Sequence, residues 1–174
     1  MDKLKRIVLN NFDAKGNVIQ HDFDKFKEVD TCTLNRFEIN DEIVKKLNEM
    51  NQLKTIIFSH CVFKNEKKLE SDIENLIITY GKNVKFANIK NPDKIKQLMI
   101  TKIENIDINE LKIFENLEEL SIFECEIRNF SEIKSFEHLK ILKLDGSQID
   151  DNEVLTEIQD RINIQYNETY HVGY

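Results

Sequence analysis

The residues that could do chemistry in this sequence are few and scattered. Its 174 residues include 3 cysteines, 4 histidines and 4 glycines. His60 and Cys61 are adjacent, but neighbouring residues of an extended chain point in different directions and make a poor pair of metal ligands. The sequence has no CxxC or HxxxH spacing, no glycine-rich phosphate loop, no GxSxG elbow and no HExxH motif. We therefore expect no enzyme activity, no metal site and no cofactor.

The thiols and the adjacent carboxylates also fit structural roles. Cys61 and Cys125 take the same place in two distant repeats, beyond disulfide reach, and are expected to be small buried side chains. Cys32 is expected to project from a strand, where it could be exposed, with a reactive thiol as the functional alternative. Asp150 and Asp151 fit a solvated turn, because acid–base catalysis needs convergent buried carboxylates.

The elements that position these cysteines and carboxylates belong to a sequence repeat. Three segments, starting at Ile95, Leu117 and Leu139, are nearly superimposable. In the second of them, apolar residues fall at Leu117, Leu120, Ile122, Cys125, Ile127, Phe130, Ile133 and Phe136. A period of about 20–30 residues with leucine or isoleucine in constant places is typical of a solenoid. We predict one domain, residues 1–174, with repeats that start near residues 4, 26, 53, 73, 95, 117 and 139 and a C-terminal cap over 161–174.

The chain resembles the leucine-rich repeat proteins, most closely the 22-residue class with the pattern LxxLxLxxNxIxxIxxLxxLxx. The resemblance implies an α/β solenoid, a right-handed superhelix with a parallel concave β-sheet of about 7–8 strands. The family's asparagine at the inner bend is replaced throughout, by Phe12, Leu34, Cys61, Gly81, Ile103, Cys125, Ser147 and Thr169. Backbone groups at the bend are then expected to find backbone or water partners instead.

Residues 64–92 fit two registers. Apolar residues from Leu69 to Tyr80 have helical spacing and Gly81 could end a helix, but a strand over 76–78 leaves a more regular repeat. We favour the strand. A helix is expected over residues 40–50, capped by Asn40 or Asp41.

Composition indicates the class of protein, the kinds of partner and the cellular location to expect. The net charge is −7 and 40% of the residues are hydrophobic, which favours a folded domain and disfavours binding to nucleic-acid phosphates. No apolar stretch approaches the roughly 20 residues that span a membrane, and no signal-like segment is present. We expect a cytoplasmic protein that binds neither nucleic acid nor membrane.

The predicted binding surface lies on the concave sheet. Strand alternation turns one residue of each strand outward between two buried ones. This outward residue is apolar in three neighbouring repeats, while Asp30 is expected to take the same place in the second repeat. The predicted protein-binding residues are these three, Phe123 beside them, and a rim just beyond: Ile57, Ile77, Met99, Phe123, Tyr80, His60 and Lys102.

The leading hypothesis is a non-enzymatic scaffold that binds a protein or peptide of unknown identity on this face. One alternative is an acidic inhibitor or immunity-type protein that masks a basic partner, because acidic residues are expected on the same face, at Glu28, Asp30, Glu119, Glu124 and Asp145. Another is a structural protein that self-associates, so that the chain is a monomer or a homodimer through the concave ridge. β-Branched residues are also simply favoured on strands, so the apolar row alone does not decide between these readings.

Overall fold

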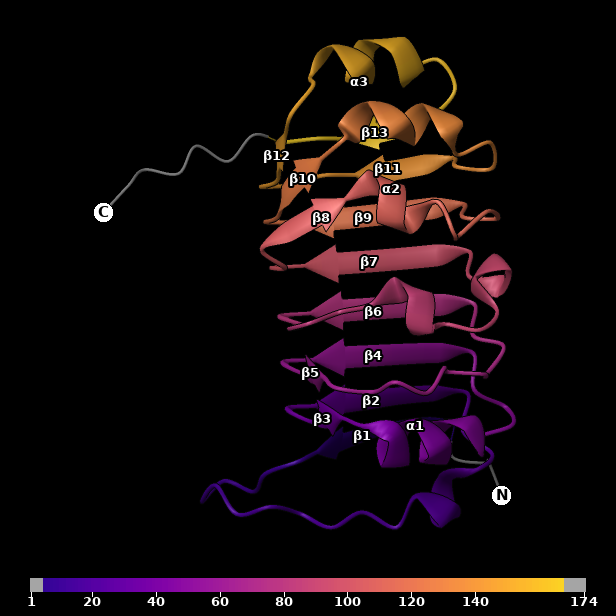
Figure 1. Ribbon diagram of the computed structural model, residues 1–174, viewed down its shortest axis with the longest axis vertical. Coiled ribbons are helices and arrows are strands. Elements are labelled where there is room, and N and C mark those ends of the chain that lie inside the picture. Colours follow the sequence, from indigo (N-terminus) through magenta and orange to yellow (C-terminus); the bar gives the residue numbers. More distant parts are fainter. Residues whose placement is uncertain (1–4, 168–174) are drawn as a thin grey trace.

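A single parallel sheet runs the length of the molecule. The computed structural model describes residues 5–167. The eight strands of the sheet lie in chain order, each beside the strand of the next repeat (Figure 1). They are β1 (Arg6–Asn10), β2 (Thr31–Asn35), β4 (Thr55–Ser59), β6 (Asn75–Thr79), β7 (Gln97–Thr101), β9 (Glu119–Phe123), β11 (Ile141–Lys143) and β13 (Asn163–Gln165). Strands that follow one another without skipping a place define a solenoid, in which each repeat packs only on its neighbours.

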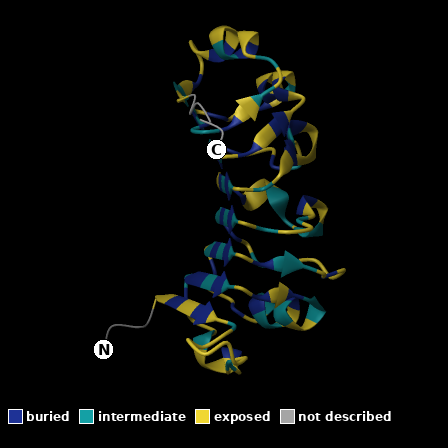
Figure 2. Cartoon of the chain, turned by 90° about the vertical axis from the view of Figure 1, so that its left-hand side faces the viewer, coloured by how far each residue is buried: buried dark blue, intermediate teal, exposed yellow. Residues whose placement is uncertain are grey.

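Short strands and helices form the other side. Two small parallel sheets pair β3 (Glu38–Ile39) with β5 (Val62–Phe63), and β10 (Glu126–Arg128) with both β8 (Asn105–Asp107) and β12 (Gln148–Ile149). The helices are α1 (Asp41–Asn48), α2 (Ile108–Leu111), α3 (Glu153–Ile158) and the 3-10 turns η1 (Phe23–Phe26), η2 (Phe86–Asn88), η3 (Pro92–Lys94) and η4 (Phe130–Ser135). Figure 2 shows the eight-stranded sheet along one side and the helices along the other. One face of the sheet, called the open face below, is left without a covering layer of described residues.

Alternation within each strand separates the core from the open face. The inward rows are in Cα register from strand to strand, and Ile56, Leu76, Leu98 and Leu120 are at most 2% exposed. Burying a large aliphatic side chain stabilises a fold by about 1.5–3 kcal/mol. Because these buried side chains recur at the same place in each strand, they fix the register of the sheet.

Two local predictions are confirmed. The helix over residues 40–50 forms as α1, and the Asn40 side chain caps it by accepting hydrogen bonds from the backbone N–H groups of Glu42 (3.1 Å) and Ile43 (3.0 Å). In residues 64–92 the strand register is the correct one, because β6 covers 75–79 and no helix spans Leu69–Tyr80.

The expected register of the second repeat is wrong by three residues. Cys32 pairs with Ile7 of β1 and Ile56 of β4, so it occupies an inward position and is 0% exposed. Val29, rather than Phe26, takes the place of the first leucine. Both residues are apolar and three positions apart, and the long segment 11–28 hides which of them continues the pattern. Cys32 is thus a core residue, and burial raises the pKa of its thiol to about 12.

The same shift moves two other expected positions. Thr33, not Asp30, stands in the outward row beside Ile57, and Asp30 lies just before the strand. At the inner bend the second repeat has the buried Phe37 in place of Leu34, which is an inward strand residue. The bend position of the last repeat, Thr169, lies outside the described residues.

At the inner bend, cysteine and serine side chains make hydrogen bonds with backbone groups in place of asparagine. The Ser147 hydroxyl donates to the carbonyl of Ile122 (2.9 Å) and accepts from the N–H of Cys125 (3.2 Å). The Cys125 sulfur in turn accepts from the N–H of Ile103 (3.4 Å), one repeat earlier. The expectation of backbone or water partners is therefore wrong at these repeats, since side chains shorter than asparagine satisfy the buried groups.

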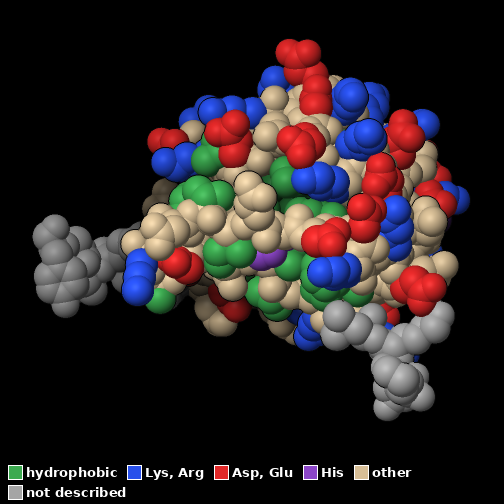
Figure 3. All heavy atoms as spheres, turned by 90° about the horizontal axis from the view of Figure 1, so that it is seen from below, with side chains coloured by type: hydrophobic (Ala, Val, Ile, Leu, Met, Phe, Trp, Pro, Cys, Tyr) green, Lys and Arg blue, Asp and Glu red, His purple; other side chains and the backbone are tan. Residues whose placement is uncertain are grey.

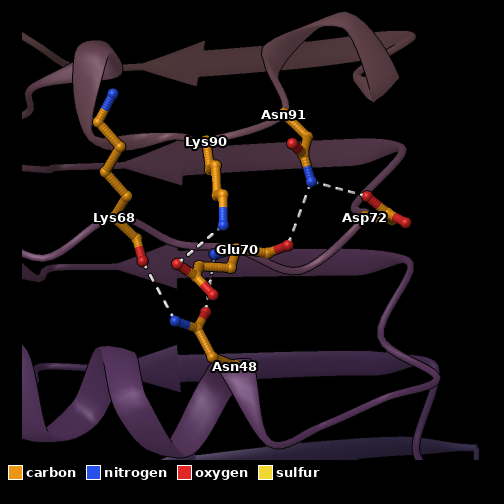
Figure 4. A network of polar contacts seen from close by, with 6 residues as sticks. All are labelled: Asn48, Lys68, Glu70, Asp72, Lys90 and Asn91. Carbon is orange, nitrogen blue, oxygen red and sulfur yellow. Dashed lines mark hydrogen bonds and ion pairs between the residues drawn. The ribbon is translucent and has the colours of Figure 1, made fainter.

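Asparagine amides instead join neighbouring repeats on the helical side (Figure 4). Asn48 accepts from the N–H of Glu70 (2.8 Å) and donates to the carbonyl of Lys68 (3.1 Å). Asn91 donates to the carbonyl of Glu70 (3.3 Å). These contacts hold the extended third repeat, which has no helix between β5 and β6. Of the helices in residues 5–167, none is both long and apolar enough to cross a membrane.

Candidate protein-binding face

Three apolar side chains form a row across the middle of the open face. Ile57, Ile77 and Met99 are in direct Cα register on β4, β6 and β7, and each is half-buried. Adjacent parallel strands lie about 4.8 Å apart, so these residues, called the ridge below, are in side-by-side contact range. Thr33 continues the row on one side and Ser121, which is 1% exposed, continues it on the other. The ridge is thus a bounded apolar strip that spans three strands.

An aromatic side chain and a row of hydroxyls flank the ridge. Phe123 on β9 is half-buried and in register with Thr101, the next outward residue after Met99 on β7. The same outward position carries a hydroxyl on the three ridge strands: Ser59, Thr79 and Thr101. Apolar anchors therefore lie beside groups that can both donate and accept hydrogen bonds.

The predicted rim residues interlock. The rings of His60 and Tyr80 stack with centroids 4.3 Å apart and planes 12° from parallel. The Lys102 Nζ lies 5.2 Å from the centre of the Tyr80 ring and 3.0 Å from a carboxylate oxygen of Glu124. Hydrogen bonds with Tyr80 and, secondly, with Glu124 raise the pKa of Lys102. His60, Tyr80 and Lys102, the rim, thus form one connected polar and aromatic line along the edge of the open face.

Each rim residue has a left-handed backbone. The φ angles are +53° at His60, +54° at Tyr80 and +54° at Lys102, with Arg36 (+61°) before them and Glu124 (+52°) after them. Only the next repeat has a glycine here, Gly146, at +70°. The left-handed conformation costs a residue other than glycine about 1–2 kcal/mol. Five successive bends thus carry long or aromatic side chains at a position where glycine would relieve strain, and the residue types alone give no sign of the left-handed backbone.

A second row that sequence reasoning missed runs along the other edge. The residue just before each strand alternates in charge over seven repeats: Lys5, Asp30, Lys54, Glu74, Lys96, Glu118 and Lys140. From Asp30 on, each backbone N–H in this charge row donates to the carbonyl of the preceding member. Ion pairs join Lys54 to Glu74 (3.1 Å) and Lys140 to Glu118 (2.6 Å). The alternation is visible once the register is known, and it leaves this edge without a patch of one sign.

Two of the five acidic residues expected on the face form ion pairs with lysines of the chain, and a third accepts a hydrogen bond. Glu119 pairs with Lys143 at 2.6 Å and Glu124 with Lys102 at 3.0 Å. Asp145 accepts a hydrogen bond from the Asn167 amide (3.0 Å). The open face therefore offers apolar and neutral polar contacts more than a field of negative charge.

The described residues offer no grouping suited to a metal ion, and the apolar cavity inside the solenoid is small. In the part of the chain that the structure describes, no three His, Cys, Asp or Glu residues are grouped to hold a metal ion. An apolar cavity of about 40 Å³ lies between the sheet and the helical side, lined by Phe63, Leu76 and Val84 among others. Ligand pockets usually measure about 300–1,000 Å³, so this cavity is too small for a metabolite. The open face is the best candidate for a functional surface.

Comparison with known proteins is informative at the level of structure. No protein-family model matches the sequence, and no curated protein matches it either. The structure is similar to the crystal structure of an internalin C2 from Listeria monocytogenes, with a TM-score of 0.52 and 16% sequence identity. The similarity covers 89% of this chain and 80% of that chain. Shared architecture over this length at such low identity establishes the fold.

Proposed function

We propose that this chain, which has the leucine-rich repeat fold that its sequence predicts, is a protein-interaction module that binds a protein partner on the open face. The observation that carries the proposal is the ridge, three half-buried apolar side chains in register on adjacent strands. Single exposed apolar residues are ordinary, whereas contiguous ones are typical of interaction sites.

The surroundings of the ridge support this role. Interfaces place apolar and aromatic anchors in the centre and polar groups around them. Here Ile77 is central, Phe123 and Tyr80 provide aromatic surface, and the hydroxyls of Ser59 and Thr79 lie between ridge and rim. The stacked and ion-paired rim is already ordered, which reduces the entropy cost of binding.

The pairing of charges favours apolar recognition over the masking of a basic partner. Because Glu119 and Glu124 already bind lysines of the same face, a cationic partner would have to break these pairs. We expect complex formation to depend weakly on salt, and a steep loss of binding in high salt would favour the basic-partner alternative. We also propose a cytoplasmic setting, which is supported by the three free and buried thiols.

A pull-down with matched variants tests the proposal. Ile77→Asp/Met99→Glu places two negative charges on the ridge, and Ala87→Asp/Thr156→Glu places the same charges at exposed sites of the helical side. We expect native lysate to yield a protein that wild type and the control retain and the ridge variant loses. Equal recovery by all three chains would exclude the open face.

Two further measurements separate loss of binding from other causes. Both variants should unfold cooperatively in urea, since the substituted side chains point away from the core. The mass of wild type in solution tests self-association: if the ridge joins two copies, Ile77→Asp alone should restore the monomer, and the ridge would then be a homodimer interface rather than a site for another protein.

A further inference from the structure

Charge is distributed unevenly along the solenoid. Residues 61–102 contain 9 lysines and 5 acidic residues, whereas residues 103–167 contain 6 basic and 16 acidic residues. Residues 1–60 contain 10 of each, and Figure 3, which views this end of the molecule, shows basic and acidic side chains intermixed. A chain with a net charge of −7 thus has one basic region, in its third and fourth repeats.

Most of these lysines lie on the helical side of two adjacent repeats. Residues 64–70 and 82–90 run side by side there, next to the parallel bridges of Val62 with Lys82 and of Leu69 with Ile89. The two segments contain two carboxylates, those of Glu66 and Glu70, and six exposed lysines. The six, called the lysine patch below, are Lys64, Lys67, Lys68, Lys82, Lys85 and Lys90.

Four members of the lysine patch have no carboxylate partner. Lys64 pairs with Glu38 (2.7 Å) and Lys90 with Glu70 (3.1 Å). In Figure 4 the Lys68 side chain extends toward the fourth repeat, whereas Lys90 reaches Glu70. Positive charges that the chain does not neutralise attract an anionic partner. Within residues 5–167, ion pairs are absent at the remaining four lysines: Lys67, Lys68, Lys82 and Lys85.

The backbone beneath the lysine patch is held by side chains of neighbouring segments. The Asp41 carboxylate accepts hydrogen bonds from the N–H groups of Glu66 and Lys67, each at 2.8 Å. The Asn88 amide donates to the carbonyl of Asn65 (2.8 Å) and so joins the two segments. A backbone that is already ordered loses little entropy on binding. The lysines therefore stand at fixed positions before a partner arrives.

The apolar cavity of about 40 Å³ opens beneath the lysine patch. Its lining includes the exposed Lys85 and the half-buried Phe63, Val84 and Ile89, which lie on the helical side. Residues 64–74 form no helix that would cover it. A cavity of this size holds more than one water molecule and fits part of one aliphatic side chain. The lysine patch thus combines unneutralised positive charge with one small apolar hollow.

We propose that the lysine patch binds an acidic segment of another protein, with carboxylates on the four lysines that lack ion pairs and one aliphatic side chain in the apolar cavity. Complementary charge selects such a partner and speeds its association. The site lies on the side of the solenoid opposite the open face (Figure 2), so the inference does not depend on the proposed function.

The surroundings favour a short acidic peptide over other anions. A nucleic acid has no aliphatic side chain to place in the cavity. A membrane is wide and flat, and it would also meet the repeats that follow, where residues 103–167 carry a net charge of −10 and oppose an anionic surface. A peptide segment can stay within the two basic repeats.

Fluorescence anisotropy with labelled peptides tests the inference. The probe is a peptide of six glutamates with a leucine at its centre, and the comparison peptide has a serine there. We expect wild type to bind the leucine peptide about fourfold more tightly than the serine peptide. Lys67→Gln/Lys85→Gln should weaken this binding by about fivefold. Lys5→Gln/Lys15→Gln makes the same charge change at exposed residues of the N-terminal end and should bind as wild type does.

Two further variants keep the test decisive. Lys68→Gln/Lys82→Gln removes the other two lysines without ion pairs and should cause a similar loss, so the result does not depend on one variant. Ile77→Asp/Met99→Glu alters the ridge and should bind the peptide as wild type does. Cooperative urea unfolding shows that each variant is folded.

Four results would overturn the inference. They are no measurable binding of the leucine peptide, equal affinity for the leucine and serine peptides, equal weakening in the lysine-patch and N-terminal variants, and tighter binding of a phosphate-bearing probe. The phosphate-bearing probes are a thymidine dodecamer and vesicles that contain phosphatidylserine. If the lysine-patch variants lose one of these probes more than the peptide, the partner is a nucleic acid or a membrane and not an acidic protein segment.

Discussion

The two halves of the solenoid differ on one side only. In the C-terminal half the repeats start at Ile73, Ile95, Leu117 and Leu139, at constant intervals of 22 residues, and β8, β10 and β12 form a regular ladder on the helical side. In the N-terminal half the intervals from Val29 to Leu53 and from Leu53 to Ile73 are 24 and 20 residues. There the helical side changes from a capped helix, α1, to an extended segment with none.

The eight-stranded sheet stays regular despite the unequal repeat lengths. Cα register is unbroken from β1 to β13, although the connections between strands differ in length. The inward positions must bury apolar side chains against both neighbours, whereas a turn at the surface can absorb an added or missing residue. The comparison shows that the open face, and with it the ridge, depends on the strands and not on the regularity of the repeats.

The largest expected effect on stability comes from truncating the leucine at the same core position in each half. Leu34 and Leu144 hold equivalent places in the second and seventh repeats and are both 0% exposed. Each change to alanine should lower the free energy of unfolding by about 2–5 kcal/mol, measured by urea denaturation. A much smaller cost for Leu34→Ala would show that the irregular half packs loosely, and the two halves would then differ on the sheet side too.

Alkaline pH should destabilise the irregular half through Cys32. Burial raises its pKa from 9.0 to about 12, so the folded state retains a proton that the unfolded state loses. The stabilisation is complete below pH 9 and declines as pH rises toward 12, by at most about 1.4 kcal/mol per pH unit for this thiol. Urea melts across this range should show a steeper decline for wild type than for Cys32→Ala. Equal slopes would mean that Cys32 is solvated.

A third test concerns the tight turn after β6, in the first repeat of the C-terminal half. A Cβ at Gly81 would lie 2.7 Å from Ile78 Cγ2 and 2.9 Å from Val84 Cγ2. Gly81→Ala should therefore cost about 1–3 kcal/mol through overpacking. Gly16→Ala is the control: its Cβ meets nothing within 4 Å, and only its φ of +84° opposes the change. An equal loss of stability in the two variants would refute the crowding at Gly81.

The smallest effect concerns the left-handed bend, which glycine occupies only in the C-terminal half. Exchanging the residue types should have opposite results: Lys102→Gly relieves strain and Gly146→Lys introduces it, each by about 1 kcal/mol. The gain at Lys102 is reduced by loss of its contacts with Tyr80 and Glu124. Thermal unfolding of both variants measures this, and a large loss of stability in Lys102→Gly would show that the rim contacts outweigh the strain.

The halves also differ in how far the sequence predicts them. From Ile95 onward, leucine and isoleucine recur so regularly that the strands and their inward rows could be placed without coordinates. In the second repeat, Phe26 and Val29 both satisfy an apolar position, and choosing Phe26 displaced Cys32 and Asp30. The rim contacts and the bend strain could not be predicted, because they depend on how one repeat lies on the next. The alternating charges of the charge row can be predicted from the sequence, but only once the strands are placed in the correct register.

A photo-crosslinking side chain placed at single positions tests the binding face most directly. It would be introduced at Ile77, in the middle of the ridge, and at Ala87, exposed on the helical side, and each variant irradiated in native lysate. We expect one discrete crosslinked protein from position 77 that is absent from position 87 and is lost when Met99→Glu is added. Equal products from both positions, or a product from position 87 alone, would contradict the claim that the open face binds the partner.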